Sequence, residues 1–529
     1  MGLGAPSTTR IEQCLLGGLA AWTVAPLLLL FVGLPGLEAA ASGAGTFTGS
    51  AGLVINDHAQ YISWIRESGD HLLFSNRFDV VPDPNLFLHP MWLVSGMLWK
   101  LGVSLQLAFA LWKPVGLLVL FAGFAAYVRR TIEPGSWARA AALAMALFFV
   151  TPSMWLTDWA GLGDADLEFG SLVMGLELFP AGFLWDVAPT AIALGLMPLF
   201  LLGVERLLVP ERRAPARSVR WYAAWTAVGG AVTSWLHPWQ GLTLLAILTG
   251  LIVWGRFGRA YVRLAVPALI TLLPLLYYQL LTRTDSAWNT VSGPNGMPHL
   301  GVWLFVGLVP LVLLALPGLR RGPDGDVQER MLRLWPLAAL GVYFALDASF
   351  FYHALAGVTL PLGVLAARGW EQVRAPPVAV AAAIAVLTLP GMAYQLDFLA
   401  EEAPGHFLSK GESAAMTYIE QSGRAGAVLA TPELGVFVPA LSGRNTWFGH
   451  STWTPGNEDR KARAAALFSG QLSPVEATAV VRESTASFLL QGCDEGRTDL
   501  RSTLGALVVA VRHFGCATVY EIDTPGAAA

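Results

Sequence analysis

The chain has 529 residues, of which 54% are hydrophobic and only 13% are charged, and its mean hydropathy is +0.54. Soluble domains carry about 25% charged residues, and a single soluble core could not bury this much apolar surface, so the composition indicates a polytopic membrane protein. The net charge of −4 is small and gives no reason to expect a nucleic-acid partner.

Apolar runs predict about 11 membrane-spanning helices, because each crossing of the hydrocarbon layer needs roughly 20 residues. The first run, 14–34, is not followed at once by a convincing signal-peptidase site, although Ala39-Ala40-Ala41 is a weak candidate. The predicted spans are 14–34, 105–128, 137–156, 186–204, 221–236, 240–256, 264–281, 301–318, 333–347, 353–368 and 376–395.

Basic residues predict the orientation of these spans. Arginines fall in every second loop, whereas 157–185 has no Lys or Arg. Cytoplasmic loops carry the excess of basic residues, so the amino end is expected in the cytoplasm and, with an odd number of spans, the carboxyl end outside. The sequence therefore predicts a plasma-membrane protein with a transmembrane domain, 1–399, that carries outer loops 35–88 and 157–185. An exterior domain, 400–529, follows it.

The predicted exterior domain has the pattern of a small α/β fold. Buried strands are expected at 425–430, 486–490 and 517–522, and helical spacing appears at 412–421 and 474–483. The segment contains no nucleophile elbow, phosphate-binding glycine loop or zinc pattern. A structural or lid role is therefore favoured over catalysis for this domain.

Two of the three cysteines, Cys493 and Cys516, fall in this exterior domain. Disulfides persist outside the cell, so the two cysteines are candidates for one. Two free buried thiols are the alternative, because spacing alone does not fix the geometry of a pair.

The first outer loop holds the main candidate for chemistry, Asp57. It lies near the amino end of a segment with apolar or aromatic residues at positions 61, 62, 64 and 65, which suggests an interfacial helix. One interpretation is that Asn56 or Asp57 caps this helix. The other is that Asp57 is a general base, taking a proton from an acceptor hydroxyl as that hydroxyl attacks a sugar carbon.

The second outer loop carries further acids. Asp164 and Asp166 form an Asp-x-Asp pattern, and carboxylate oxygens of this kind bind Mg²⁺ or Mn²⁺ and bridge it to phosphate. An exposed, glycine-rich turn is the alternative. Without a metal ion, Asp158 beside Trp159 is the better catalytic candidate.

Three cations or imidazoles are candidates for substrate binding. Lys113 lies in the outer half of the second predicted span, where it either pairs with a donor phosphate or extends to the membrane surface. His237, which precedes a proline, is either a packing residue or a substrate contact. His58, next to Asp57, is also predicted to bind substrate.

Short motifs recur in one order along nearly the whole chain. They are Asn56-Asp57 with Tyr61, Asn76-Arg77-Phe78 followed by His89-Pro90, Asp158-Trp159, His237-Pro238, Gly357 to Gly369, Gly435, Gly443-Arg444 and Gly449-His450. In this order and topology the chain resembles the GT-C superfamily of membrane glycosyltransferases, and within it a bacterial group of GT-C-like proteins. One departure is Tyr352-His353, which stands where a basic pair is expected.

The resemblance implies a catalytic Asp in the first outer loop, here Asp57. It also implies a polyprenyl-phosphate-linked sugar as donor and, in metal-dependent members, an ion held by an acidic motif in the second loop. We therefore expect an integral-membrane glycosyltransferase that transfers the sugar from this lipid-linked donor to an exterior glycan, lipid or protein. The alternative is a non-catalytic lipid-linked glycan binding protein or a transporter, although transporters usually place charges at midplane and have repeated halves.

Overall fold

The structure is a computed structural model, and the chain divides into two compact units. Unit 1 comprises Met1–Leu29, Trp112–Gln279 and Gly296–Ala400, and unit 2 comprises Leu30–Leu111, Leu280–Asn295 and Glu401–Ala529. The residues that the structure describes are 10–33, 45–134, 137–152, 156, 159–161, 177–209, 216–254, 258–293, 301–320, 326–346, 349–493 and 498–523.

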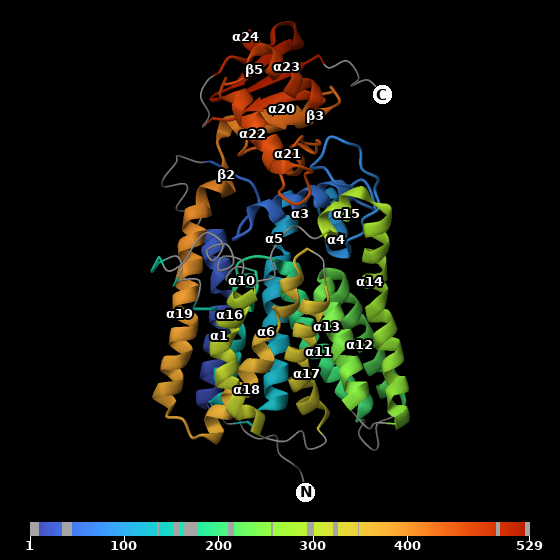
Figure 1. Cartoon of the computed structure of the whole chain (residues 1–529), viewed down its shortest axis with the longest axis vertical. Helices are drawn as coiled ribbons and strands as arrows, with labels where there is room; N and C mark the ends of the chain where they lie inside the picture. The colour runs from blue at the N-terminus through green and yellow to red at the C-terminus, as the bar shows by residue number, and fades with distance from the viewer. Residues whose placement is uncertain are drawn as a thin grey trace. The chain divides into compact units, whose positions relative to one another are not determined.

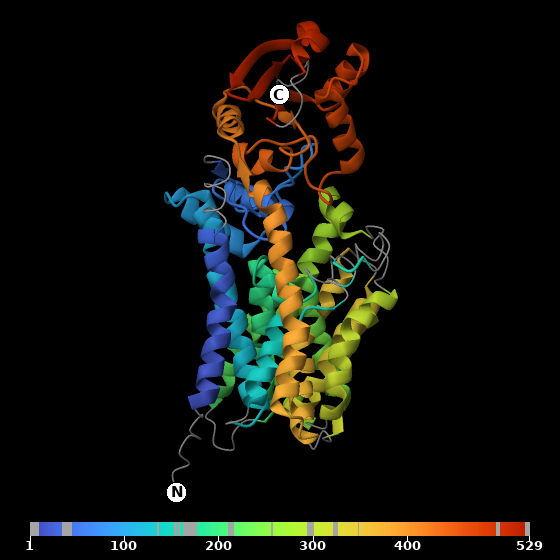
Figure 2. The ribbon, with the colours of Figure 1, turned by 90° about the vertical axis from the view of Figure 1, so that its left-hand side faces the viewer.

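Unit 1 is a bundle of helices. Helices α6 and α11 pack side by side, and α11 packs on α12 (Figure 1). Helix α7 packs on α18. The long orange helix in Figure 2 is α19, which has 26 residues. The bounds are α1 (Arg10–Leu28), α6 (Trp112–Thr131), α7 (Ala138–Phe148), α10 (Pro180–Phe183), α11 (Ala188–Leu208), α12 (Ala216–Leu236), α13 (Pro238–Trp254), α14 (Ala265–Thr284), α16 (Gly301–Ala315), α17 (Val327–Ala345), α18 (Thr359–Gln372) and α19 (Pro377–Glu402).

Several helices of the chain meet the length and apolarity of a membrane span. Among the described residues four qualify, Leu105–Thr131, Ala188–Leu208, Ala260–Thr284 and Pro377–Glu402, and three apolar helices are shorter. The protein is therefore a multi-pass helical membrane protein, and the larger number of spans remains a prediction.

Glycines allow two of these helices to approach at backbone distance. A Cβ added to Gly123 of α6 would overlap the carbonyl of Gly195 in α11, and one added to Gly195 would overlap the carbonyl of Val119. Small residues at such crossings are typical of membrane bundles, where close packing replaces the hydrophobic effect as the force between helices.

Unit 2 contains the small carboxyl-terminal sheet that the sequence predicts. Its strand order is β3-β4-β6-β5, with β3 and β4 parallel and the other neighbours antiparallel. The strands are β3 (Ala427–Ala430), β4 (Ala486–Gln491), β5 (Val508–Phe514) and β6 (Ala517–Ile522), and a separate pair joins β1 (Thr46–Phe47) to β2 (Phe407–Leu408). Both β3 and β4 are buried along their whole length, as near-continuous apolar runs require.

Helices from three parts of the sequence complete unit 2. They are α3 (Ile55–Ser68), α4 (Pro90–Lys100), α5 (Leu105–Ala110), α15 (Ser286–Ser292), α20 (Lys410–Gln421), α21 (Phe437–Ser442), α22 (Asn457–Phe468), α23 (Pro474–Glu483) and α24 (Leu500–Leu504). Helices α20 and α23 each begin with a capping box, at Ser409 with Glu412 and at Ser473 with Glu476. These reciprocal bonds fix where each helix starts.

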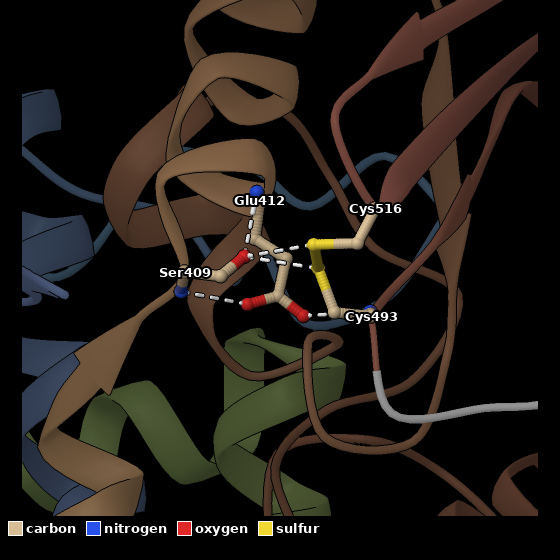
Figure 3. Close-up of a disulfide and its surroundings, with 4 residues drawn as sticks. All are labelled: Ser409, Glu412, Cys493 and Cys516. Carbon is tan, nitrogen blue, oxygen red and sulfur yellow. Dashed lines mark hydrogen bonds between the residues drawn. A yellow bond between two sulfur atoms is a disulfide. The ribbon is translucent and has the colours of Figure 1, made fainter. Parts of the chain in front are cut away.

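The two cysteines of unit 2 form a disulfide, so the alternative of two free thiols is wrong. Cys493, after β4, is joined to Cys516 in the β5–β6 hairpin. Figure 3 shows the bond against the first turn of α20, where the Glu412 carboxylate accepts a hydrogen bond of 3.0 Å from the Cys493 amide. The cross-link therefore fastens the hairpin, β4 and α20 together.

Candidate active site

Asp57 lies in the first turn of α3 and does not cap it. The residue at the amino-cap position is Val54, and no side chain makes the capping hydrogen bond. The interpretation of Asn56 or Asp57 as a cap is therefore wrong. Asp57 is 39% exposed, and the positive end of the helix dipole favours a negative charge at this place.

Glu67, at the other end of α3, holds the loop that follows the helix. Its buried carboxylate accepts hydrogen bonds from the amide and hydroxyl of Ser75, at 3.0 and 2.7 Å, and from Asn85 at 2.7 Å. It also forms an ion pair of 3.0 Å with Arg77. A carboxylate with this many donors is stable in a buried position, so Glu67 is a structural residue that ties residues 75–85 to α3.

The same loop is hydrogen-bonded to a distant stretch of the chain. Asn76 donates to the carbonyl of Trp453 at 2.9 Å, and the Thr454 hydroxyl donates to the carbonyl of Phe78 at 2.8 Å. Arg460 forms an ion pair with Asp79 at 2.8 Å. These bonds join the predicted first outer loop and the carboxyl-terminal segment within unit 2.

Two glycines set the path of the chain just before His450. A Cβ on Gly449 would lie 2.6 Å from the carbonyl oxygen of Gly435, closer than real Cβ contacts. The backbones touch there, so neither position has room for a side chain. This close approach explains in physical terms why Gly435 and Gly449-His450 form part of one pattern.

Asp57 and His450 meet at the centre of this arrangement. The Nε2 atom of His450 lies 3.3 Å from Oδ1 of Asp57, and the imidazole is only 3% exposed. The contact has ion-pair distance but not the alignment of a hydrogen bond, since within the described part of the chain Nε2 has no hydrogen-bond partner. A buried imidazole therefore lies within ion-pair distance of a carboxylate that is partly exposed to solvent.

His58, which the sequence predicts to bind substrate, faces the interior of unit 2. It is fully buried, its Nδ1 lies 3.1 Å from the Ser50 hydroxyl, and its ring packs on Phe109. His89 is buried as well, stacked on Trp92, and burial lowers its pKa to about 3, so it is uncharged. Both histidines pack the loop; a substrate contact of His58 stays a prediction.

The acids of the second predicted outer loop cannot be placed. Asp158, Asp164 and Asp166 lie outside the described residues. Within those residues no group of three or more His, Cys, Asp and Glu side chains lies close enough to hold a metal ion. Asp57 and His450 alone offer too few ligands to fit a divalent cation.

Lys113, in unit 1, makes an internal contact. Its Nζ donates to the backbone carbonyl of Trp185 at 3.1 Å, and the side chain is buried. The residue therefore does not extend to the membrane surface within the bundle. A role in holding a donor phosphate stays a prediction.

His237, also in unit 1, belongs to a cluster with the pair Tyr352-His353. The rings of His237 and His353 lie 5.2 Å apart. The Tyr352 hydroxyl donates to Glu177 at 2.8 Å, and Nε2 of His353 lies 3.4 Å from the same carboxylate oxygen. Where the resemblance leads us to expect two basic residues, this chain instead has an aromatic pair that contacts an acid of its own.

Sequence reasoning singled out Asp57 but missed its partner. His450 entered only as one member of a motif in the predicted exterior domain, nearly four hundred residues away. The available signal was Gly449-His450 with Gly435, a pattern that indicates close backbone packing. Without coordinates nothing pairs that histidine with the first loop.

Comparisons with known proteins agree with this architecture. No protein-family model and no curated protein matches the sequence. Among solved structures, the chain is similar to the archaeal oligosaccharyltransferase AglB from Archaeoglobus fulgidus in complex with an inhibitory peptide and a dolichol-phosphate. The TM-score is 0.52 at 12% identity, over 91% of this chain and 70% of that one. It is also similar to the arabinofuranosyltransferase AftD from Mycobacteria, with a TM-score of 0.54 at 13% identity, over 98% of this chain and 42% of that one.

At these identities the similarity establishes the fold and nothing finer. The structural neighbours are membrane glycosyltransferases of the GT-C superfamily. The chain therefore has the fold of these GT-C enzymes, as the resemblance of the sequence motifs predicts, and membership of the bacterial group stays a prediction.

Proposed function

We propose that this protein is a membrane glycosyltransferase that transfers a sugar from a polyprenyl-phosphate donor to an acceptor outside the cell, with Asp57 as the general base. The observation that carries the proposal is the Asp57 carboxylate itself. It is partly exposed in the first turn of α3, does not cap the helix, and is supported by His450.

The chemistry needs little more than a placed base. As the acceptor hydroxyl oxygen forms a bond to the anomeric carbon, its proton passes to a carboxylate oxygen of Asp57. The bond from the anomeric carbon to the phosphate oxygen breaks, and polyprenyl phosphate leaves with the bonding electrons. A positioned carboxylate can contribute about 10²–10⁴-fold to such a step.

The donor class is supported by the neighbours. AglB was solved with a dolichol-phosphate and a peptide, and both fit a donor carried by a membrane lipid and a glycan or protein acceptor. We also retain Lys113 as a contact of the donor phosphate, because a buried cation in a membrane bundle is costly unless it serves a binding role.

The test uses the full chain in lipid nanodiscs with a panel of undecaprenyl-phosphate-linked sugars, and measures release of undecaprenyl phosphate. Asp57→Asn keeps the side-chain shape and removes the proton acceptor, so turnover should fall by about 10²–10⁴-fold. Asp70→Asn is the matched control, since Asp70 is an exposed acid of the same predicted loop and forms an ion pair with Lys100 at the surface.

Turnover near the wild-type level in Asp57→Asn would overturn the assignment of the base. A wild-type protein that binds undecaprenyl phosphate but releases none from any donor of the panel would favour the alternative, a non-catalytic lipid-linked glycan binding protein.

The proposed orientation places unit 2 outside the plasma membrane and the amino end inside. The basis is the excess of arginine in alternate loops. Single cysteines at Ser218 and Ser451 test it by labelling of intact cells with an impermeant maleimide. Only the cysteine at 451 should react, and labelling at 218 would reverse the orientation.

A divalent cation at Asp164 and Asp166 is proposed from the sequence pattern alone. A structure of the Archaeoglobus fulgidus oligosaccharyltransferase is in complex with Zn and sulfate, which shows that a neighbour of this fold can be obtained with a metal ion. Loss of turnover with a chelator, restored by Mg²⁺ or Mn²⁺, is the expected result. Full turnover in the chelator would remove the proposal.

A further inference from the structure

We propose that His450 is a positioning residue for Asp57: a neutral imidazole whose Nε2 proton faces the carboxylate and fixes which of its oxygens receives the acceptor proton. This inference rests on the proposed role of Asp57 as base. His450 lies in the predicted exterior domain, 400–529, for which the sequence favoured a structural or lid role over catalysis.

The hydrogen bonds of His450 determine its tautomer. Its Nδ1 accepts a hydrogen bond from the backbone amide of Thr452 at 3.3 Å and lies 3.1 Å from the Thr452 hydroxyl. A ring nitrogen that accepts from a backbone N–H has no proton of its own. The neutral ring therefore carries its proton on Nε2, the atom that lies 3.3 Å from Oδ1 of Asp57.

The imidazole has little freedom to move. The Phe78 ring meets it edge-on with centroids 5.4 Å apart. The His450 amide donates to the Thr454 hydroxyl at 3.3 Å, and that hydroxyl donates to the carbonyl of Phe78 at 2.8 Å. With Gly449 in backbone contact with Gly435, the ring is held from the backbone outward.

The burial of the two groups decides which one acts on substrate. The histidine side chain is 3% exposed and the aspartate side chain 39%. In Ser-His-Asp triads the carboxylate is buried and orients a histidine that reaches the substrate. Here the order is reversed, because a buried imidazole orients a carboxylate that reaches the solvent.

The arrangement assigns different roles to the two oxygens of Asp57. The present contact lacks hydrogen-bond alignment, and a small rotation of the partly exposed carboxylate toward Nε2 would complete the bond. Oδ1 is then occupied by the N–H of His450, and Oδ2 is left to the incoming hydroxyl. Fixing the base in this way lowers the cost of orienting it during the reaction.

The first test separates positioning from packing by comparing two substitutions at His450. His450→Gln retains an N–H that can reach Asp57, whereas His450→Leu fills similar space without a donor. Leu should lower kcat by about 10–100-fold with little change in the KM for the donor, the size expected for a misplaced group. Gln should recover most of the lost kcat. His513→Leu, at an exposed histidine of β5, is the control.

The second test needs no substrate. In the full chain with ¹⁵N-labelled histidine, His450→Gln identifies the His450 signals by their disappearance. We expect Nδ1 without a proton and Nε2 with one, and Asp57→Asn should shift the Nε2 proton signal.

The outcomes distinguish this inference from the proposed function. A proton on Nδ1, or equal kcat values for the Gln and Leu variants, would overturn the role of His450 even if Asp57→Asn is inactive. Full activity in Asp57→Asn would instead overturn the role of the base. The Nε2-protonated ring, with Gln rescue of kcat, supports the positioning role.

Discussion

The two units differ in how they use some of their polar side chains. In unit 1, buried hydroxyls turn back to their own helix: Thr226 donates to the carbonyl of Tyr222 and Thr271 to that of Pro267, both at 2.7 Å. In unit 2, polar groups bond residues hundreds of positions apart, such as Asn76 and Trp453. Unit 1 has long-range bonds as well, such as the one from Tyr352 to Glu177, but its helices also meet at backbone distance at Gly123 and Gly195. In unit 2 the long-range bonds hold the segment that carries His450, so this network can place a reactive group.

The largest effect on folding is expected from a substitution at Gly195, where α11 and α6 are in backbone contact. Gly195→Leu forces a side chain into the backbone of α6 at Val119, and overpacking of this kind separates the helices because backbone cannot yield. We expect no folded monomer, measured by size-exclusion chromatography in detergent. Gly229→Leu in α12 is the control, since an added Cβ meets nothing within 4 Å there. Equal yields of both variants would contradict the packing argument.

In unit 2, the next largest effect is expected at the disulfide. Cys493→Ser removes a cross-link that closes 23 residues, and a loop of that size corresponds to a loss of about 3 kcal/mol of stability. Thermal unfolding, followed by proteolysis of residues 400–529, should detect the loss of stability. A reducing agent should lower the unfolding temperature of the wild type only. An unchanged unfolding temperature would mean that the capping box at Ser409 and Glu412 holds the hairpin without the bond.

A smaller effect, on binding, is expected at the cation of unit 1. Lys113→Met should weaken binding of undecaprenyl phosphate about tenfold, as expected for one charged hydrogen bond, while Lys113→Arg should be partly tolerated. Thermophoresis of the full chain measures both. If the Met variant binds as tightly as the wild type, Lys113 does not hold the donor phosphate and serves the internal contacts of unit 1, such as its bond to the Trp185 carbonyl.

The same contrast explains what the sequence could predict. The four described helices that meet the length and apolarity of a membrane span lie on predicted apolar runs. The short strands β3, β4 and β6 lie where the runs at 425–430, 486–490 and 517–522 place them. Strand β5 was missed, although Val508-Val509-Ala510-Val511 has the β-branched composition that is typical of a strand. The pairing of β4 with β3 and with β6 could not be predicted either, because the spacing of apolar residues within one strand does not indicate which distant strand lies beside it.

The candidate site shows the same limit. Asp57 could be identified from its place in the predicted first outer loop, yet excluding its interpretation as a cap needed the observed amino-cap, Val54. Its partner His450 depends on bonds between Asn76, Phe78 and the segment around Trp453. Such long-range contacts follow from tertiary packing, so a single sequence without coordinates cannot pair the two residues.

The smallest effect concerns pH and belongs to the network of unit 2. Burial is the main reason why the pKa of Asp83 is raised to about 6, and the nearby carboxylates of Asp285 and Glu67 add to the shift. A hydrogen bond of 2.6 Å from the Asn76 amide opposes it. A raised carboxyl pKa favours folding while the group is protonated. That contribution is complete below about pH 4 and is lost as the pH rises through about 6.

Asp83→Asn should therefore raise the thermal stability of the protein at pH 7.5 and leave it nearly unchanged at pH 4.5. The amide oxygen still accepts from Asn76, and no charge forms. Because Asp83 is only half buried, solvent screening limits the gain to about 1 kcal/mol. Unfolding temperatures of Asp83→Asn at the two pH values measure it, with Asp70→Asn as an exposed control. A variant that is less stable than the wild type at pH 7.5 but not at pH 4.5 would contradict this prediction, because it would show that the charge of Asp83 supports the network.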